Sequence, residues 1–176
     1  MLKLADGRTR VDITLTEPPG YSIGDDVLEL ALAQLTDLID TSEQINKPDY
    51  RLSATGSATV PDQPLEKEGN ATTFGASNYE GSLTILRHLL ATGQIDPAKD
   101  TVFTAIGEKG VLAYYFERIG PKATVPLAVG DEGWIYEAIS DDPQEPSDRN
   151  GYVKNLIKLG VQSRRRFKIV AAPVGG

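Results

Sequence analysis

The chain has 176 residues, with 18 lysines and arginines against 25 aspartates and glutamates, and a formal net charge of -7. Its length and its 40% hydrophobic content predict one folded domain with a packed core and exclude a disordered chain. The acidic balance disfavours a protein that holds nucleic acid through phosphate contacts, and the absence of cysteine excludes disulfides, thiolate catalysis and cysteine-ligated zinc.

The N-terminal part of the chain predicts a strand and then a helix. Residues 9–16 (TRVDITLT) alternate apolar and polar side chains, which predicts a half-buried strand. From Val27, the leucines of VLELALAQLTDLID fall at helical spacing, with Asp25 or Asp26 as an N-cap. We therefore expect a helix over residues 27–40, although its later part also fits the approach to a strand.

Two strands of similar design follow, separated by a long connection. Residues 50–60 (YRLSATGSATV) and 78–85 (NYEGSLTI) each alternate between an apolar face and a polar face rich in small hydroxyls. The segment 61–78 between them is rich in Pro, Gly, Asn, Ala and Thr. Hairpins usually need about two to five connecting residues, and a much longer loop is normally functional or disordered.

The second half of the chain reads mainly as strands. Asp96-Pro97 begins a short helix whose apolar stripe is Ala98, Val102 and Ile106 and which ends at Gly107. Residues 111–119, 132–140 and 152–162 are expected to be strands, and the basic end RRRFKIVAAPVGG is expected to finish in mobile residues. The whole pattern predicts a mainly β sandwich or barrel with one or two flanking α-helices.

The sequence offers little catalytic chemistry. His88, the only histidine, lies among leucines and is expected to be packed or exposed and not a general base. The acidic residues of DDPQEPSD (141–148) fit no calcium-loop spacing and are expected to be a solvated loop. We expect no enzyme, no catalytic residue, no metal and no cofactor. No run has the character of a signal peptide or a membrane span, so we expect cytosolic synthesis and no membrane partner.

The only basic run, Arg164 to Arg166, admits three interpretations. It is a contact to nucleic acid or acidic lipid, an exposed strand edge kept soluble by charge, or one half of an ion pair with another subunit. The negative net charge favours the third interpretation over DNA binding.

Several segments resemble a known family. The stretch DYRLSATGSATVPDQPLEKEGNATTFGASNYEGSLTILR (49–87) is similar to the major tail tube proteins of long-tailed, non-contractile bacteriophages, particularly those that infect actinobacteria. LADGRTRVDITL, DTVFTAIGEKGVLAYYFERIG and GDEGWIYEAISDDPQEPSDRNGYVKNLIKLGVQ agree in the same order. The resemblance covers most of the chain and is weakest over residues 25–47.

The resemblance implies both a fold and a role. Such proteins have a β-sandwich or barrel core with a flanking helix, and they form hexameric rings that stack into a tube. DNA leaves the capsid through the lumen, which a tape-measure protein fills during assembly. The implied partners are further copies of the chain, the tape-measure protein, and the tail tip and tail terminator proteins. The implied location is the virion tail, after assembly in the host cytoplasm.

A tube that conducts DNA should not bind it, because phosphate contacts would add up along its length. We therefore expect an acidic, hydroxyl-lined wall. Either polar strand face is a candidate for the lumen, and the outer wall is the other position open to each. The candidate residues are Ser53, Thr55, Ser57 and Thr59 on the first strand, and Asn78, Glu80, Ser82 and Thr84 on the second.

Stacked rings also need contacts that reach beyond one subunit. Within the single domain 1–176, the expected extensions are the N-terminal segment 1–26, the loop 61–78 and the C-terminal tail 160–176. The candidate inter-ring residues are Leu65, Glu66, Lys67, Glu68, Asn70, Thr72, Phe74, Asn78, Arg164, Arg165 and Arg166. Such a contact is heterologous and propagates as a filament. The alternative function is a monomeric β-sandwich binding module, such as a carbohydrate-binding or adhesive domain.

Overall fold

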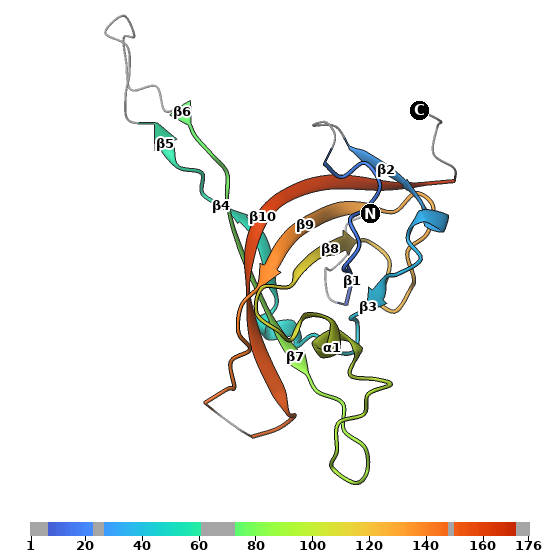
Figure 1. The fold of residues 1–176 in the computed structure, drawn as a ribbon. Coiled ribbons are helices and arrows are strands. Elements are labelled where there is room, and N and C mark those ends of the chain that lie inside the picture. Colours follow the sequence, from blue (N-terminus) through green and yellow to red (C-terminus); the bar gives the residue numbers. More distant parts are fainter. Residues whose placement is uncertain (1–6, 23–26, 61–72, 148–149, 172–176) are drawn as a thin grey trace, which may run out of the picture.

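One curved sheet dominates the structure, a computed structural model that describes residues 7–22, 27–60, 73–147 and 150–171 (Figure 1). Seven strands follow the order β3-β1-β8-β9-β10-β7-β4, β2 also pairs with β10, and β5 with β6 forms a separate pair. The strands are β1 (Thr9–Thr14), β2 (Leu28–Ala31), β3 (Ile39–Asp40), β4 (Arg51–Thr55), β5 (Thr59–Val60), β6 (Thr73–Phe74), β7 (Asn78–Leu86), β8 (Leu112–Ile119), β9 (Glu132–Ser140) and β10 (Lys154–Val170). The helices are η1 (Leu32–Gln34), η2 (Lys47–Asp49) and α1 (Thr101–Ile106). The mainly β architecture with a short helix is as predicted.

Each face of the sheet carries its own apolar cluster. Because directly paired residues of antiparallel strands share a face, the register places Ile13, Tyr115 and Tyr136 together on one side. Val102 and Ile106 of α1 cover this side and belong to the same cluster. The other side carries Phe116, Ile135 and Phe167, packed with Tyr21, Leu28 and Leu30 from the chain before and within β2.

β10 joins the two clusters. It runs for 17 residues and pairs with β7 at its start, with β9 along most of its length, and in parallel with β2 at its end. Its register against β9 shifts between Val161 and Ser163. The sequence predicted a strand only to residue 162, followed by a basic tail. Residues 160–170 are instead part of the central sheet.

The predicted helix over residues 27–40 is wrong. Leu28 and Leu30 lie in β2, opposite Phe167 and Ile169 of β10, and fill the second cluster. Only the three residues of η1 are helical, and Ile39 and Asp40 pair with β1. The leucines at positions 28, 30 and 32 also fit the two-residue period of a strand, and pairing with β10 decides between the two periods.

The first strand is more buried than its alternation predicted. Arg10 and Asp12 are both buried, although they lie on the face expected to be solvated. The Arg10 guanidinium holds Asp12 through two hydrogen bonds of 2.7 and 2.6 Å and reaches Asp40 at 3.0 Å. Leu15, expected on the buried face, lies beyond β1 and is exposed. A charged network therefore replaces solvent on one side of β1.

The short helix is confirmed but starts later than predicted. α1 begins after Asp100, and Gly107 follows its last residue, as expected. The Asp100 carboxylate makes no cap to the helix. It accepts hydrogen bonds from the Arg87 guanidinium instead, the shortest of them 2.6 Å. β9 has the predicted bounds of residues 132–140, and β8 begins one residue after the predicted start.

Arg118 at the end of β8 organises the loop that leads to β9. Its side chain is almost fully buried and forms an ion pair with Asp131 at 2.9 Å. The same guanidinium donates to the backbone carbonyls of Pro121, Lys122 and Pro126. One buried side chain therefore holds four points of the loop from Gly120 to Asp131.

We predict that Arg118→Met destabilises the fold by about 3–5 kcal/mol, because it leaves Asp131 without its charge partner and three carbonyls without a donor. Urea unfolding monitored by circular dichroism measures the change. Arg166→Met is the matched control, since the Arg166 side chain is 55% exposed and its guanidinium lies 4.0 Å from Glu132. The control should lose less than about 1 kcal/mol. Equal losses in the two variants would contradict this role of Arg118.

Candidate assembly surfaces

The structure joins the two polar strand faces that the sequence left as alternatives. β4 and β7 are antiparallel neighbours, and their paired residues point to the same side of the sheet. The facing pairs are Arg51 with Ser82, Ser53 with Glu80, and Thr55 with Asn78. The hydroxyls of one predicted face and the polar groups of the other therefore form a single surface, which we call the polar face.

Three of the eight predicted residues lie outside this surface. Thr84 is buried, contrary to expectation, because β7 is a central strand there, with β10 on one side and Gln44 to Asn46 on the other. Ser57 and Thr59 lie beyond the end of β4, where the chain leaves the sheet. Ala54 and Ala58, predicted on the apolar face, are both exposed. Ala58 lies beyond the end of β4, whereas Ala54 lies within β4, the last strand of the sheet.

The polar face is not acidic, although an acidic wall was expected. Its one predicted acid, Glu80, forms an ion pair with Arg51. Lys158 of β10 lies opposite Ser82 on the same face and is exposed. The polar face thus combines a neutralised ion pair, small hydroxyls, an amide and a lysine.

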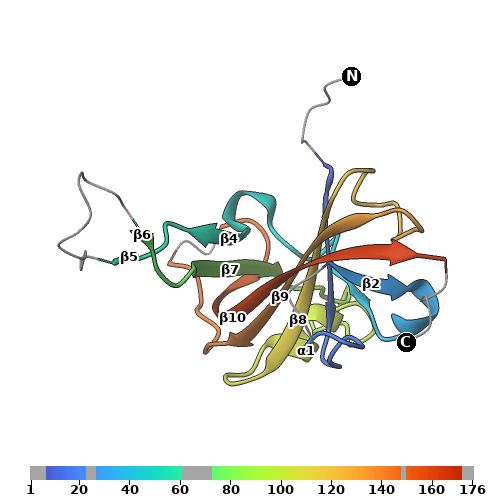
Figure 2. The same ribbon diagram turned by 90° about the horizontal axis from the view of Figure 1, so that it is seen from above.

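Where the structure describes it, the long connection between β4 and β7 forms a two-stranded antiparallel arm, β5 with β6. β5 and β6 pair at Thr59 with Phe74 and continue the two sheet strands outward. Figure 1 shows this arm projecting from the body, and Figure 2 shows the same extension from above. The Gly75 N–H donates to Ala58 O at 2.7 Å, and Asn78 Nδ2 donates to Gly56 O at 3.0 Å. The Phe74 side chain is 72% exposed.

Of the predicted inter-ring residues in this segment, Phe74 lies on the arm and Asn78 at its base. The other predicted residues of the loop fall outside the described part of the chain, and their predicted role stays a prediction. They are Leu65, Glu66, Lys67, Glu68, Asn70 and Thr72.

The three arginines predicted to reach another subunit all contact their own chain. The Arg164 guanidinium stacks 3.8 Å from the centroid of the Trp134 ring. Arg165 donates to the backbone carbonyls of Gly20 and Tyr21 at 2.6 Å, and Arg166 lies 4.0 Å from Glu132. All three pair with β9 in the sheet and are not on a free edge along that side. Their proposed contact with another subunit remains untested.

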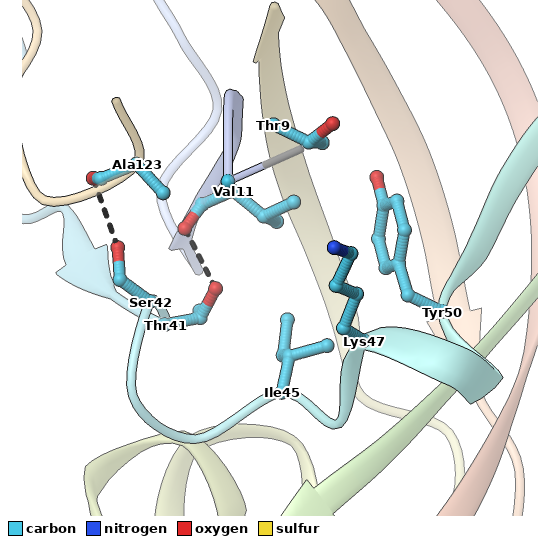
Figure 3. A pocket seen from close by; sticks show the side chains of 9 residues that line it. Thr9, Val11, Thr41, Ser42, Ile45, Lys47, Tyr50 and Ala123 are labelled. Carbon is cyan, nitrogen blue, oxygen red and sulfur yellow. Dashed lines mark hydrogen bonds between the residues drawn. The ribbon is translucent and has the colours of Figure 1, made fainter. Parts of the chain in front are cut away.

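A pocket of about 510 Å³ opens beside β1 and η2 (Figure 3). Val11, Ile45 and Tyr50 give it apolar walls, and Lys47 also lines it. Two of its hydroxyls already have partners, since Thr41 donates to Val11 O at 2.7 Å and Ser42 donates to Ala123 O at 3.2 Å. The pocket therefore has the character of an apolar recess and lacks a nucleophile paired with a base.

Tyr50 links this recess to a buried carboxylate. Its hydroxyl donates a hydrogen bond to Glu117. Glu117 is buried and pairs with Val11, so it lies on the side of β8 that α1 covers. Burial raises the pKa of Glu117 above its ordinary value, while the bond from Tyr50 and the positive charge of Arg164 act in the opposite direction. Burial and the neighbouring Glu117 also raise the pKa of the Tyr50 hydroxyl.

The residues considered for chemistry do not converge. His88 lies in the loop after β7, and the nearby acidic loop is partly neutralised by Lys109, 3.3 Å from Asp142 and 3.6 Å from Asp141. Within residues 7–22, 27–60, 73–147 and 150–171, no three metal-binding side chains gather. In the same ranges no helix has the length and apolarity needed to cross a membrane.

Comparison with known proteins decides what these surfaces belong to. Residues 1–173 match the family described as phage tail tube protein. The chain belongs to this family. As a tail tube protein it is a structural component of the phage tail and not an enzyme, which agrees with the sequence-based expectation. Membership does not support the alternative of a monomeric binding module.

The other two comparisons found no match among curated proteins and a distant likeness among solved structures. No curated protein matches the tail tube protein significantly. A chain in the six-fold symmetrised cryo-EM structure of the anti-feeding prophage (AFP) baseplate is similar to it at 16% identity with a TM-score of 0.44. The similarity covers 94% of this chain and 96% of that chain. A likeness this distant does not bear on function.

The buried Glu117 predicts a pH dependence of stability. Because its pKa is raised in the folded protein, the folded state binds more protons than the unfolded state just above the ordinary glutamate pKa. The free energy of unfolding should therefore fall as pH rises through this window. Glu117→Gln keeps an acceptor for Tyr50 and removes the charge, so it should gain stability relative to wild type between about pH 4 and pH 7.

Thermal unfolding of both proteins across this pH range measures the difference. Glu132→Gln, which changes an exposed carboxylate, is the control and should show no such relative gain. Parallel pH profiles for wild type and Glu117→Gln would show that burial does not control this carboxyl.

Proposed function

We propose that this tail tube protein forms hexameric rings that stack into a tube, and that phage DNA passes through the lumen during ejection. The observation that carries the proposal is the β5–β6 arm, which extends two strands of the sheet away from the body. An arm of this kind costs backbone entropy without adding to the core, and contact with a neighbouring copy would offset that cost. Family membership makes that neighbour a tail protein.

The segments that resemble siphophage proteins support a long, non-contractile tail as the setting. In that setting the tape-measure protein occupies the lumen during assembly, and tip and terminator proteins contact the two ends of the tube. DNA passes without specific binding. The arm, together with the parts of the N-terminal segment and the C-terminal tail that lie outside β1 and β10, provides the proposed contacts between subunits.

The polar face is our candidate for the lumen wall. Ser53, Thr55 and Asn78 offer neutral hydrogen-bonding groups to water and no charge to phosphate. The ion pair with Glu80 holds the Arg51 guanidinium. A paired arginine has less to gain from DNA than a free one. A polar face with few free cations attracts DNA only weakly, because affinity for DNA grows with each phosphate neutralised. Weak attraction lets DNA pass rapidly through the lumen.

Assembly is tested directly by negative-stain microscopy and native mass spectrometry of concentrated protein, with and without tail-tip components. Tubes or six-membered rings are expected. A chain that stays monomeric at high concentration, and that also fails to join tails when tip components are present, would sink the proposal.

Removing the arm should separate folding from stacking. Thr55 and Asn78 face each other in the ladder, so replacing residues 56–77 with Asn-Gly closes a two-residue hairpin at a native pair. The core residues Leu52 and Leu83 are untouched, and unfolding should shift by no more than about 1 kcal/mol. Stacking should be lost in microscopy. Normal tubes from this variant would show that the arm is not an inter-ring contact.

A charge change on the polar face should slow DNA release. Glu80→Lys adds a cation and also frees Arg51 from its ion pair, in every copy around the lumen. Ejection should slow at low salt and recover at high salt, because screening weakens phosphate contacts. Glu29→Lys on β2 makes the same change of charge at an exposed site away from the polar face and is the matched control. Release at wild-type rates at both salts would place the polar face outside the lumen.

A further inference from the structure

Exposed apolar side chains gather at the end of the molecule opposite the arm. The loop that follows β7 contributes Leu89, Leu90 and Ile95, which are each more than 40% exposed. The loop that precedes β10 contributes Tyr152 at 79% exposed and Val153 at 51%. We call these five residues the basal patch. Figure 1 shows both loops at the bottom of the view and the arm at the top.

The two loops of the basal patch are held together. The Arg87 N–H donates to Val153 O at 2.8 Å, and Leu89 pairs with Ile95 across a short bridge. The Arg87 side chain is itself fixed, since it binds Asp100 and lies 3.6 Å from the centroid of the Phe103 ring. The surface is therefore pre-organised before any partner arrives.

A hollow of about 610 Å³ opens between these loops. Its apolar lining residues are Leu86, Leu89, Tyr152 and Val153, and the others are Glu43, Arg87, His88 and Gly151. A hollow with apolar side chains and a few polar groups in its lining suits an aromatic anchor in a protein interface.

We propose that the basal patch is the docking surface for the arm of a second copy of this chain, with Phe74 as the anchor. The proposal rests on the proposed function and names the receiving side of the stacking contact. Phe74 is exposed on an arm at one end of the chain, and the basal patch is exposed at the other. Two different surfaces at opposite ends give a head-to-tail contact that does not close, as a growing tube requires.

The buried area is sufficient for this partner. An aromatic side chain buries about 150–250 Å² when it enters a pocket. Repeated six times around the proposed ring, the Phe74 side chains alone reach the roughly 800 Å² per partner of a standard stable interface. Six copies of a contact that is weak between two single chains can therefore hold two rings together.

Two variants disable one side of the contact each. Phe74→Asp removes the anchor and keeps the basal patch, and Leu89→Ser with Tyr152→Ser removes the basal patch and keeps the arm. Val129→Ser is the control, since Val129 is 57% exposed and lies outside both surfaces. All three should fold, as shown by unchanged melting. Each disabled variant alone should need at least about a thirtyfold higher concentration to stack, and the control should stack normally.

Mixing the two disabled variants gives the decisive result. The intact basal patch of the Phe74→Asp variant accepts the intact arm of the Leu89→Ser, Tyr152→Ser variant. The resulting complex exposes only a disabled arm and a disabled patch, so it cannot grow further. We expect a one-to-one complex, of rings or of single chains, by native mass spectrometry and analytical ultracentrifugation, and no tubes. Normal stacking by the patch variant, or no complex in the mixture, would overturn the proposal. The proposed function can also fail separately. If the two variants form a one-to-one complex but the wild-type protein never forms rings or tubes, the interface between arm and basal patch is supported and the tube is contradicted.

Discussion

The whole fold depends on one irregularity in β10. The odd-numbered residues Ile157, Leu159, Phe167 and Ile169 are apolar, and in a regular strand all of them would point to one face. The register shift between Val161 and Ser163 inserts one residue and reverses this alternation. The first two residues therefore enter the cluster under α1, and the last two enter the cluster with β2. A single strand thus contributes side chains to the apolar clusters on both faces of the sheet.

Sequence reasoning succeeded where a local pattern identifies a strand and failed where long-range pairing decides the structure. Strands with a simple local pattern, such as β9, were predicted with their observed bounds, because a short apolar run between turns identifies them. β10 was predicted only in part, because Ser163 and the basic run Arg164 to Arg166 interrupt its apolar alternation. The leucines before residue 40 fit two periods, and only their pairing with β10 selects the strand. Long-range pairing is not readable from one sequence.

The candidate surfaces show a similar division. The arm was expected because a connection of that length needs a reason, and Phe74 was among its predicted contacts. The union of Ser53 with Glu80 on one face required the register of β4 and β7, which no local pattern gives. The basal patch was missed. The run LRHLL, considered for its histidine, and the adjacent Tyr152 and Val153 were the available signal, since apolar residues in loops mark contact sites.

The arm joins the body through a short segment with few ladder bonds. β4 ends at Thr55 and β5 begins at Thr59, and only a few hydrogen bonds, such as that from Gly75 to Ala58, cross the gap. A region with so little packing deforms at low energy, whereas the strands on either side of it resist bending. A tube stacked through such arms would behave as rigid segments linked by compliant joints. It could curve in any direction without distortion of the subunit cores, and the bending stiffness of the tail would be set by the residues from Gly56 to Ala58.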